Sequence, residues 1–481
     1  MNGASVIETH SGVVFFYGDR AYKLKKAVDL GFLDFTDRAV RRAVCHREVE
    51  LNRRLAPDVY LGVADVIGPG GDPWDHLVVM RRLPDERRLA TMVAAGQDVA
   101  CEVRRLARRL AVFHAAAARS PVIDAAGGIE RLLEHWAGNT AVLRSHIGSV
   151  LDVDDVERAA RLSERYLEGR RRLLAHRVER GRIVDGHGDL LAEDIFCLPD
   201  GPRVLDCLEF DDRLRYGDVL ADVAFLAMDL EHLGAPRAAE DLLSRYRRLT
   251  NDDWPASLVD HDVAYRAHVR AKVSCLRFDQ GGERAGGDAR DLLALAVRHL
   301  ERARVRLVLV GGLPGTGKTT LASMLGDELV WVVLSSDEIR KELAGVPSDR
   351  PVPVAFGEGL YRAERTVATY RTMLERARTA LGLGQSVILD ASWLDPCRRV
   401  EAVAVAHETS SDVTQLRCEL PTELAATRLR TRLASERGAS DATPEVLAAM
   451  AAVAPGWPSA RSVHTEGDPS SVLAAALAEL R

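Results

Sequence analysis

The stretch Gly312-Leu313-Pro314-Gly315-Thr316-Gly317-Lys318-Thr319 decides the fold of the second half of this 481-residue chain. Its spacing is G-x-x-x-x-G-K-S/T, it follows the apolar run Val305–Val310, and helical sequence continues from Lys318. Glycines at these positions let backbone N–H groups wrap around a phosphate, and the start of a helix adds partial positive charge. A chance glycine turn would not explain a strand, a loop and a helix in this order. We therefore predict a nucleotide-binding P-loop.

The loop also predicts individual contacts with ATP and Mg²⁺. Lys318 would reach the β- and γ-phosphates, and Thr319 would offer its hydroxyl to Mg²⁺. The predicted nucleotide-binding residues of this segment are Gly312, Gly315, Gly317, Lys318, Thr319 and Thr320.

Strands and helices alternate on the C-terminal side of the loop. Apolar strands are expected at Val330–Leu334 and Ser386–Leu389, with helices between them to about Leu383. Such alternation predicts an α/β P-loop NTPase fold, with a parallel sheet and helices on both faces. Asp390 ends the second of these strands and is a candidate Mg²⁺ ligand. The alternative is an aspartate that caps the following helix.

Asp337 and Arg340 follow the strand that ends near Leu334, at the edge of the sheet where α/β proteins bind ligands. Asp337 could accept the proton of an acceptor hydroxyl, and Arg340, one turn on, could neutralise the transferred phosphoryl group. The alternative is that Ser336 or Asp337 only caps a helix.

Over about residues 305–460 the chain resembles the small P-loop kinases allied to polynucleotide kinase, zeta toxin and gluconate kinase. The likeness includes Gly357–Tyr361 and the run Arg428–Arg432 leading to Ser440–Pro444. In that family a helical lid brings arginines over ATP, which implies this role for Arg428 and Arg432. A solvated arginine face is the alternative.

The first half reads as a small β-rich lobe followed by a larger helical lobe. A β-hairpin is expected from Val13–Tyr17 and Ala21–Lys25, and a helix from Asp37 to about Leu55. Strands at Leu61–Ile67 and His76–Met80 and helices from Asp98 complete the outline, with short strands and turns around residues 183–209.

A second group of acids lies between His187 and Glu209. His187-Gly188-Asp189 and Asp194 have the spacing H-x-D-x-x-x-x-N/D of a kinase-type catalytic loop, and Val204–Glu209 reads as a short apolar strand that carries Asp206. A phosphotransferase needs one carboxylate near the acceptor hydroxyl, here Asp189, and others on Mg²⁺, here Asp194 and Asp206. Three unrelated surface acids would not explain this arrangement.

Nearly all of residues 1–300 resemble the aminoglycoside phosphotransferase and choline kinase branch of the protein-kinase-like fold. The likeness rests on Ala21–Lys23, Glu48, Leu106–His114, the His187–Asp194 loop, and Asp206 followed by Arg215, Asp218 and Asp222. It implies that Lys23 contacts the ATP phosphates and that Glu48 orients it. Lys25 shares the strand face and is an alternative; a solvated lysine-rich hairpin edge is another.

The same resemblance assigns His187, Arg215, Asp218 and Asp222 to the structure of the loop, the last three through buried salt bridges. The chain departs from the family at Asp194, where asparagine is general, and this adds a negative charge beside Asp189 and Asp206. No glycine-rich phosphate loop is evident in this half.

A change in sequence texture divides the two halves. Gln280–Gly287 reads as a loop, a helical pattern follows to Arg304, and a new strand opens at Val305. We expect a domain at residues 1–300, with an α+β bilobal fold, and a P-loop domain at residues 305–481.

Composition limits the class of protein. With 47% hydrophobic and 28% charged residues the chain is globular, and its net charge of −6, divided evenly between the halves, suggests neither a nucleic acid nor a membrane partner. Seven scattered cysteines without a C-x-x-C motif favour reduced thiols and a cytoplasmic location. The chain has 59 arginines but only six lysines, and four of these six, Lys23, Lys25, Lys26 and Lys318, fall in the two candidate phosphate sites.

Together these features predict a bifunctional ATP-dependent kinase that phosphorylates hydroxyls of small molecules such as sugars or amino sugars. The alternative is that one half is a nucleotide-binding regulator without catalysis. Asp194 favours the N-terminal half for this role. A polynucleotide 5′-kinase is disfavoured by the charge and by the lack of interleaved aromatic and basic residues. The sequence leaves the oligomeric state and the identity of each acceptor open.

Overall fold

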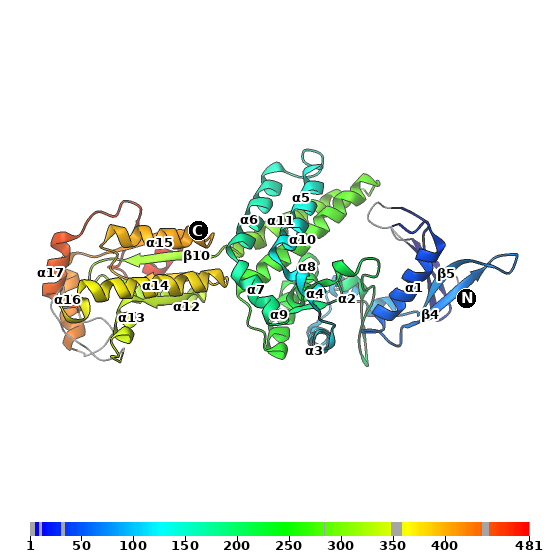
Figure 1. Ribbon diagram of the computed structural model, residues 1–481, viewed down its shortest axis with the longest axis horizontal. Coiled ribbons are helices and arrows are strands. Elements are labelled where there is room, and N and C mark those ends of the chain that lie inside the picture. The colour runs from blue at the N-terminus through cyan, green and yellow to red at the C-terminus, as the bar shows by residue number, and fades with distance from the viewer. Residues whose placement is uncertain are drawn as a thin grey trace. The chain divides into compact units, whose positions relative to one another are not determined.

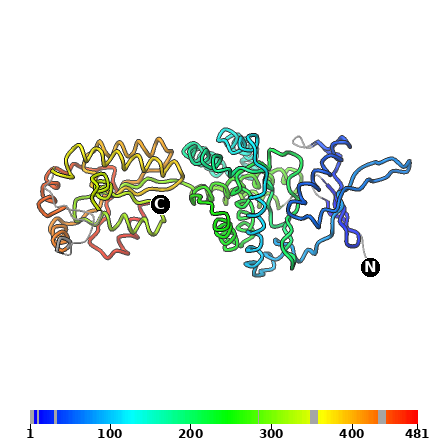
Figure 2. The backbone as a smooth tube through the Cα atoms, turned by 60° about the horizontal axis from the view of Figure 1, so that its bottom comes forward, coloured from blue at the N-terminus to red at the C-terminus, as the bar shows by residue number. Residues whose placement is uncertain are grey.

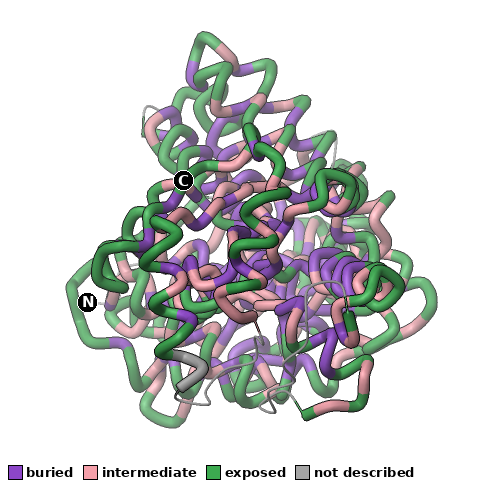
Figure 3. The backbone as a smooth tube through the Cα atoms, turned by 90° about the vertical axis from the view of Figure 1, so that its left-hand side faces the viewer, coloured by how far each residue is buried: buried purple, intermediate pink, exposed green. Residues whose placement is uncertain are grey.

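The computed structural model describes residues 5–8, 12–29, 34–282, 284–347, 358–434 and 442–480. The chain forms two compact units (Figure 1). The first contains Met1–Ser163, Leu174–Trp254 and Leu258–Arg302, and the second contains Glu164–Leu173, Pro255–Ser257 and Ala303–Arg481. Buried segments, purple in Figure 3, contrast with the green exposed segments around them. Among the described residues, no helix is both long and apolar enough to cross a membrane.

The first unit opens with a five-stranded antiparallel sheet in the order β1-β2-β3-β5-β4, blue in Figure 2. The hairpin of β2 and β3 pairs Tyr17 with Arg20 across a tight turn, and it confirms the predicted hairpin. Helix α1 packs on β4 and β5 through Cys45 and Val49. The elements of this lobe are β1 (Ser5–Glu8), β2 (Gly12–Tyr17), β3 (Arg20–Lys25), α1 (Arg38–Asn52), β4 (Tyr60–Ile67) and β5 (Pro73–Arg81).

A helical lobe follows and carries two short strand pairs, β6 with β9 and β7 with β8. These pairs hold the loops that contain the predicted acids. Of the residues of this lobe, Glu164–Leu173 and Pro255–Ser257 are grouped with the second unit. The helices are α2 (Leu89–Ala94), α3 (Ala100–Ala116), α4 (Pro121–Asp124), α5 (Ile129–Arg144), α6 (Val153–Gly169), α7 (Arg171–Glu179), α8 (Val219–His232), α9 (Pro236–Thr250), α10 (Ala256–Asp279) and α11 (Ala285–Arg302). The strands are β6 (Ile183–Asp185), β7 (Ile195–Leu198), β8 (Gly201–Val204) and β9 (Tyr216–Asp218).

Two local predictions for this unit were wrong. The strand expected at Val204–Glu209 ends at Val204, because Asp206 takes a φ of 61°, which an extended strand cannot contain. The loop expected at Gln280–Gly287 gives way to α11 at Ala285. A Cβ on Gly286 would lie 3.2 Å from the Phe278 ring, so this glycine lets two helices approach closely instead of marking a loop.

The second unit is built on a five-stranded parallel sheet in the order β11-β12-β10-β13-β14. Val308 and Val310 point from β10 toward α12 and α18, while α14 and α15 pack on the other side of the sheet (Figure 1). This confirms the predicted α/β fold. The elements are β10 (Arg306–Gly311), α12 (Lys318–Leu329), β11 (Val332–Ser335), α13 (Ser336–Leu343), α14 (Ala363–Gly382), β12 (Val387–Asp390), α15 (Pro396–Glu408), β13 (Asp412–Glu419), α16 (Thr422–Ala434), α17 (Pro444–Val453), β14 (Arg461–His464) and α18 (Pro469–Ala478).

Candidate active sites

The glycine-rich loop joins β10 to α12 at the carboxyl edge of the parallel sheet. The φ angles of Gly312, Gly315 and Gly317 are 142°, 81° and 86°. Residues that have a Cβ atom rarely adopt such positive φ angles. A Cβ on Gly315 would lie only 2.6 Å from the carbonyl oxygen of Ala425. The shape of the loop therefore depends on its glycines.

A cavity of about 330 Å³ lies beside this loop. The guanidinium of Arg428 enters its lining and donates a hydrogen bond of 2.8 Å to the Thr465 carbonyl. The structure thus brings Arg428 together with most of the predicted loop residues, while Arg428 itself is exposed, as the alternative of a solvated arginine face also requires. Gly312 is not in the lining. The side chain of Arg432 lies outside the described residues, as do Gly357, Ser440 and Asp441. The cavity is lined by Gly315, Gly317, Lys318, Thr319, Thr320, Leu321, Met324, Arg428, Leu429, Thr465, Gly467, Pro469 and Val472.

Asp390 ends β12, in register with Ser335 at the end of β11. Burial raises the pKa of Asp390, while the charge of Lys318 and the hydroxyl of Thr319 oppose the rise. Its Oδ1 atom is buried and accepts no hydrogen bond from the residues that the structure describes. A carboxylate oxygen of this kind beside the Thr319 hydroxyl fits Mg²⁺, which prefers oxygen ligands. The capping alternative was wrong, because Asp395 caps the next helix.

Asp337 and Arg340 form an ion pair of 2.6 Å within α13. The Arg340 side chain is buried and lies over the Tyr361 ring, 4.4 Å from its centroid. Ser335 stands at the N-cap of α13 and makes no side-chain cap, and Asp337 lies inside the first turn. Neither Ser336 nor Asp337 is therefore the cap, and both predicted catalytic side chains lie next to the strand end that carries Asp390.

In the first unit, Lys23 and Lys25 project from the same face of β3 toward Glu48 on α1. The Lys23 ammonium lies 3.0 Å from Glu48 Oε1 and also contacts Asp206. Lys25 lies 2.6 Å from Glu48 Oε2 and contacts Glu209. The Lys25 side chain is 1% exposed and that of Lys23 is 12% exposed, so Lys23 lies nearer the accessible surface and beside the candidate metal ligand.

The three predicted acids of this unit interact with one another, and their pKa values are shifted in different directions. Burial raises the pKa of Asp189 to about 6, although Arg270 opposes the shift. Burial and the charges of Asp206 and Asp189 raise the pKa of Asp194 well above its ordinary value. Burial also opposes ionisation of Asp206, but Lys23 outweighs it and lowers that pKa. The Asp206 side chain is 48% exposed, which leaves it open to a ligand. These residues could hold Mg²⁺ and accept a proton.

Hydrogen bonds of Asp222 and His187 hold the loop that carries Asp189. Asp222 accepts hydrogen bonds from the backbone N–H groups of His187 and Gly188, at 2.6 and 3.0 Å. The His187 Nε2–H donates to the Leu205 carbonyl, and burial lowers its pKa to about 4, so the ring stays neutral. The predicted structural role of His187 and Asp222 follows from these contacts. Asp218, by contrast, pairs with Arg177.

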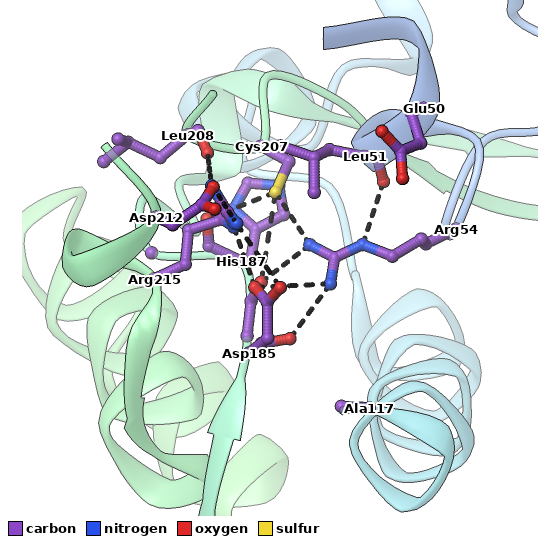
Figure 4. A network of polar contacts seen from close by, with 12 residues as sticks. Glu50, Leu51, Arg54, Ala117, Asp185, His187, Cys207, Leu208, Asp212 and Arg215 are labelled. Carbon is purple, nitrogen blue, oxygen red and sulfur yellow. Dashed lines mark hydrogen bonds and ion pairs between the residues drawn. The ribbon is translucent and has the colours of Figure 1, made fainter. Parts of the chain in front are cut away.

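Sequence reasoning missed Arg54, which ties the end of α1 to this loop (Figure 4). Its guanidinium donates to the carbonyls of Asp185 and Gly186, at 2.9 and 2.8 Å, and to Cys207 Sγ at 3.1 Å. Arg215 completes the network by bridging the Asp185 carboxylate and the Leu208 carbonyl. In a chain with 59 arginines nothing in the sequence distinguishes Arg54 from the rest.

Comparison with protein families matches both units. The phosphotransferase enzyme family matches residues 20–257, and an AAA domain of the P-loop kinase-like type matches residues 307–456. Among solved structures, a choline/ethanolamine kinase family protein from Mesorhizobium loti is 14% identical, covering 63% of this chain and 86% of that one with a TM-score of 0.38. A sugar kinase from Janibacter is 21% identical, covering 37% and 94%, with a TM-score of 0.28.

Curated relatives match the chain along nearly its whole length. Uncharacterized proteins of Mycobacterium tuberculosis and Mycobacterium bovis are each 44% identical over 462 residues, which is 96% of this chain and 92% of theirs. The chain belongs to the family of these mycobacterial proteins, and it joins a kinase-like domain of the phosphotransferase enzyme family to a P-loop kinase-like domain.

Proposed function

We propose that each domain transfers the γ-phosphoryl group of ATP to a hydroxyl of a small molecule, which makes the protein a bifunctional kinase. One observation carries the proposal: each domain gathers its own lysine, metal-type carboxylate and proton acceptor. In the first domain these are Lys23, Asp206 and Asp189. In the second they are Lys318, which lines the cavity at the glycine-rich loop, together with Asp390 and Asp337, whose charges interact.

In the first domain the acceptor hydroxyl would attack the γ-phosphorus while its proton passes to Asp189. The new O–P bond forms as the bond to the β,γ-bridging oxygen breaks, and ADP leaves. Lys23, held by Glu48, offsets phosphate charge. The raised pKa of Asp189 makes it a stronger base than an ordinary aspartate when it is ionised.

In the second domain the backbone N–H groups of the glycine-rich loop and the Lys318 ammonium would hold the phosphates. Asp337 would take the proton of the acceptor hydroxyl, and Arg340, fixed over Tyr361, would offset charge on the transferred group. Arg428 would cover the nucleotide from the Thr465 side of the cavity. These positions come from the glycine-rich loop and from α13 and α16, the helices that follow β11 and β13.

Magnesium fits both sites. Asp194 and Asp206 would hold it in the first domain, and Thr319 and Asp390 in the second, where it would neutralise phosphate charge. The seven cysteines form no disulfide, which supports the expected cytoplasmic location. Small-molecule acceptors remain our proposal for both domains, with no nucleic acid or membrane partner.

An acceptor screen tests this function. The full-length protein is incubated with ATP, Mg²⁺ and panels of sugars, amino sugars, sugar acids and nucleosides, and phosphorylated products are detected by mass spectrometry. We expect one product to disappear in Asp189→Ala and a different product to disappear in Lys318→Ala. If Asp189→Ala left every product unchanged, the first domain would act as the regulator that we consider the alternative.

A further inference from the structure

Helix α10 places two arginines, Arg266 and Arg270, one turn apart beside the proposed base. Arg266 Nη1 lies 3.5 Å from the carbonyl oxygen of Gly188, the residue that precedes Asp189. The Arg266 guanidinium is packed over the Phe225 ring, 4.7 Å from its centroid, which fixes its direction. Both arginines are half-buried, so the charge they bring to the acceptor side of Asp189 is only partly hydrated.

Arg270 is close enough to Asp189 and Asp229 for its charge to oppose the rise in the pKa of both carboxyls. Asp229, however, accepts a hydrogen bond of 2.7 Å from the backbone N–H of Ala192. Asp189 in turn is the group that we propose to accept the proton of the acceptor hydroxyl. Both carboxylates interact with Arg270 through their charge, but in the described part of the chain neither forms an ion pair with it.

The cations of α10 differ from two buried arginines of the first unit, Arg177 and Arg215. Arg177 and Arg215 each bind two carboxylates. Arg266 and Lys272, by contrast, have neutral partners: the Ala221 carbonyl for Arg266 and the Asn139 side chain for Lys272. Within the described part of the chain, no carboxylate forms an ion pair with Arg266, Arg270 or Lys272. A partly buried cation that forms no ion pair loses hydration without full compensation, and an anionic ligand would recover part of that free energy.

The charges of α10 also act on α5, whose Trp136 contacts a ring of α10. Besides burial, the charges of Arg131 and Arg266 lower the pKa of His135, and Lys272 adds to this effect. Trp136, on the same helix, contacts the ring of Tyr265 on α10, with 5.4 Å between centroids. On α5, Arg131 pairs with Glu134 at 3.1 Å, so among the described residues the positive charge beside Asp189 that has no ion-paired carboxylate comes from α10.

We propose that the acceptor of the first domain is a polyhydroxy compound with an anionic group, either a phosphate ester or a carboxylate, and that Arg266 and Arg270 bind this group. The inference rests on the proposed phosphotransfer at Asp189. The acceptor hydroxyl forms its O–P bond, the bond to the β,γ-bridging oxygen breaks, ADP leaves and the proton passes to Asp189, while the anionic group stays paired with the arginines. A cationic amino sugar would be repelled by the same charges.

The test compares four matched acceptors in the full-length Lys318→Ala variant, in which the second domain is silenced. These are glucose, glucosamine, gluconate and glucose 6-phosphate, and ADP release is measured for each. We expect transfer to one or both anions. Arg270→Gln should raise the KM for that anion on the order of tenfold to a hundredfold, with a smaller change in kcat, because a charged hydrogen bond is lost. Arg270→Lys should recover part of the affinity.

Arg277→Gln is the matched control, because Arg277 is an exposed arginine on the same helix. It should leave the KM unchanged. Preference for glucosamine or glucose, or an equal effect of Arg277→Gln and Arg270→Gln, would overturn the inference while leaving the phosphotransferase function standing.

A binding measurement separates failure of the inference from failure of the function. Gluconate and glucose 6-phosphate are titrated calorimetrically into Asp189→Asn saturated with Mg²⁺ and a non-hydrolysable ATP analogue, which also fills the P-loop. Binding that Arg270→Gln abolishes would support the anionic site even if no transfer occurred. If neither anion bound and neither was phosphorylated, the inference would be overturned.

Discussion

If Asp189 is the base that we propose, its ionisation sets the pH dependence of the first domain. Its pKa of about 6 means that the ionised base is present above that pH and is lost as the pH falls through it. In the Lys318→Ala variant we therefore expect kcat/KM to fall about tenfold per pH unit below about pH 6. Arg270→Gln removes a positive charge that lowers the pKa of Asp189, so the decline in kcat/KM should begin at a higher pH. A profile that is flat from pH 5 to 8 would contradict the assignment.

Asp194 stands where related kinases generally have asparagine, and its raised pKa explains how the site accepts it. Burial and two neighbouring carboxylates favour the protonated form, which is uncharged and nearly isosteric with the amide of asparagine. We expect Asp194→Asn to keep kcat/KM near the parent value and Asp194→Ala to lower it about tenfold or more. Steady-state kinetics at pH 7 check this. A severe loss in Asp194→Asn would show that the negative charge is needed.

The choice between Lys23 and Lys25 shows the limit of the sequence at this scale. Alternation along β3 places both on one face, and the resemblance supplies Glu48 as their partner. The resemblance does not show that Lys25 forms an ion pair with Glu209 while Lys23 forms one with Asp206. The position of Asp206 beside Lys23 goes with a left-handed backbone at Asp206, and no local sequence pattern predicts that conformation.

Helix α11 is held to α8 and α10 by a histidine between two acids. His299 lies 2.8 Å from Glu231 and 2.6 Å from Asp260, and these partners outweigh burial and raise its pKa. A raised folded-state pKa gives stability that is complete below the unfolded value of about 6.5 and is lost as the pH rises through the folded value.

The prediction from this contact is a pH-dependent difference in stability. At pH 6, His299→Gln should destabilise the first domain by about 1.5–3 kcal/mol, and the difference should shrink toward pH 9. Thermal unfolding of both proteins across this range measures it. A difference that grew with pH would contradict the charged pairing.

Most elements could be predicted, because their hydrophobic periodicity and turn residues act locally. The β2–β3 hairpin, the P-loop with its flanking strand and helix, and the strand that ends at Asp390 are of this kind. The start of α11 was missed because Gly286 serves packing against Phe278, a contact made between helices. The network at Arg54 was missed for the same reason, since its partners are distant carbonyls.

At the scale of the whole molecule, the two sets of residues that we propose to bind phosphate and Mg²⁺ lie in separate units. Neither set borrows a residue from the other: Lys23, Glu48 and Asp206 belong to the first unit, and Lys318 and Asp390 to the second. The mycobacterial relatives match across both units, so the pairing of the two domains is a property of the family. Each domain should therefore bind ATP without the other.

The most direct test of this account is the stoichiometry of ATP binding, which needs no knowledge of either acceptor. Full-length protein is titrated calorimetrically with a non-hydrolysable ATP analogue in the presence of Mg²⁺, alongside Lys23→Met, Lys318→Met and the double variant. We predict two sites in the parent protein, one in each single variant and none in the double variant. A single site in the parent protein, or the loss of both sites in either single variant, would contradict two independent kinase domains.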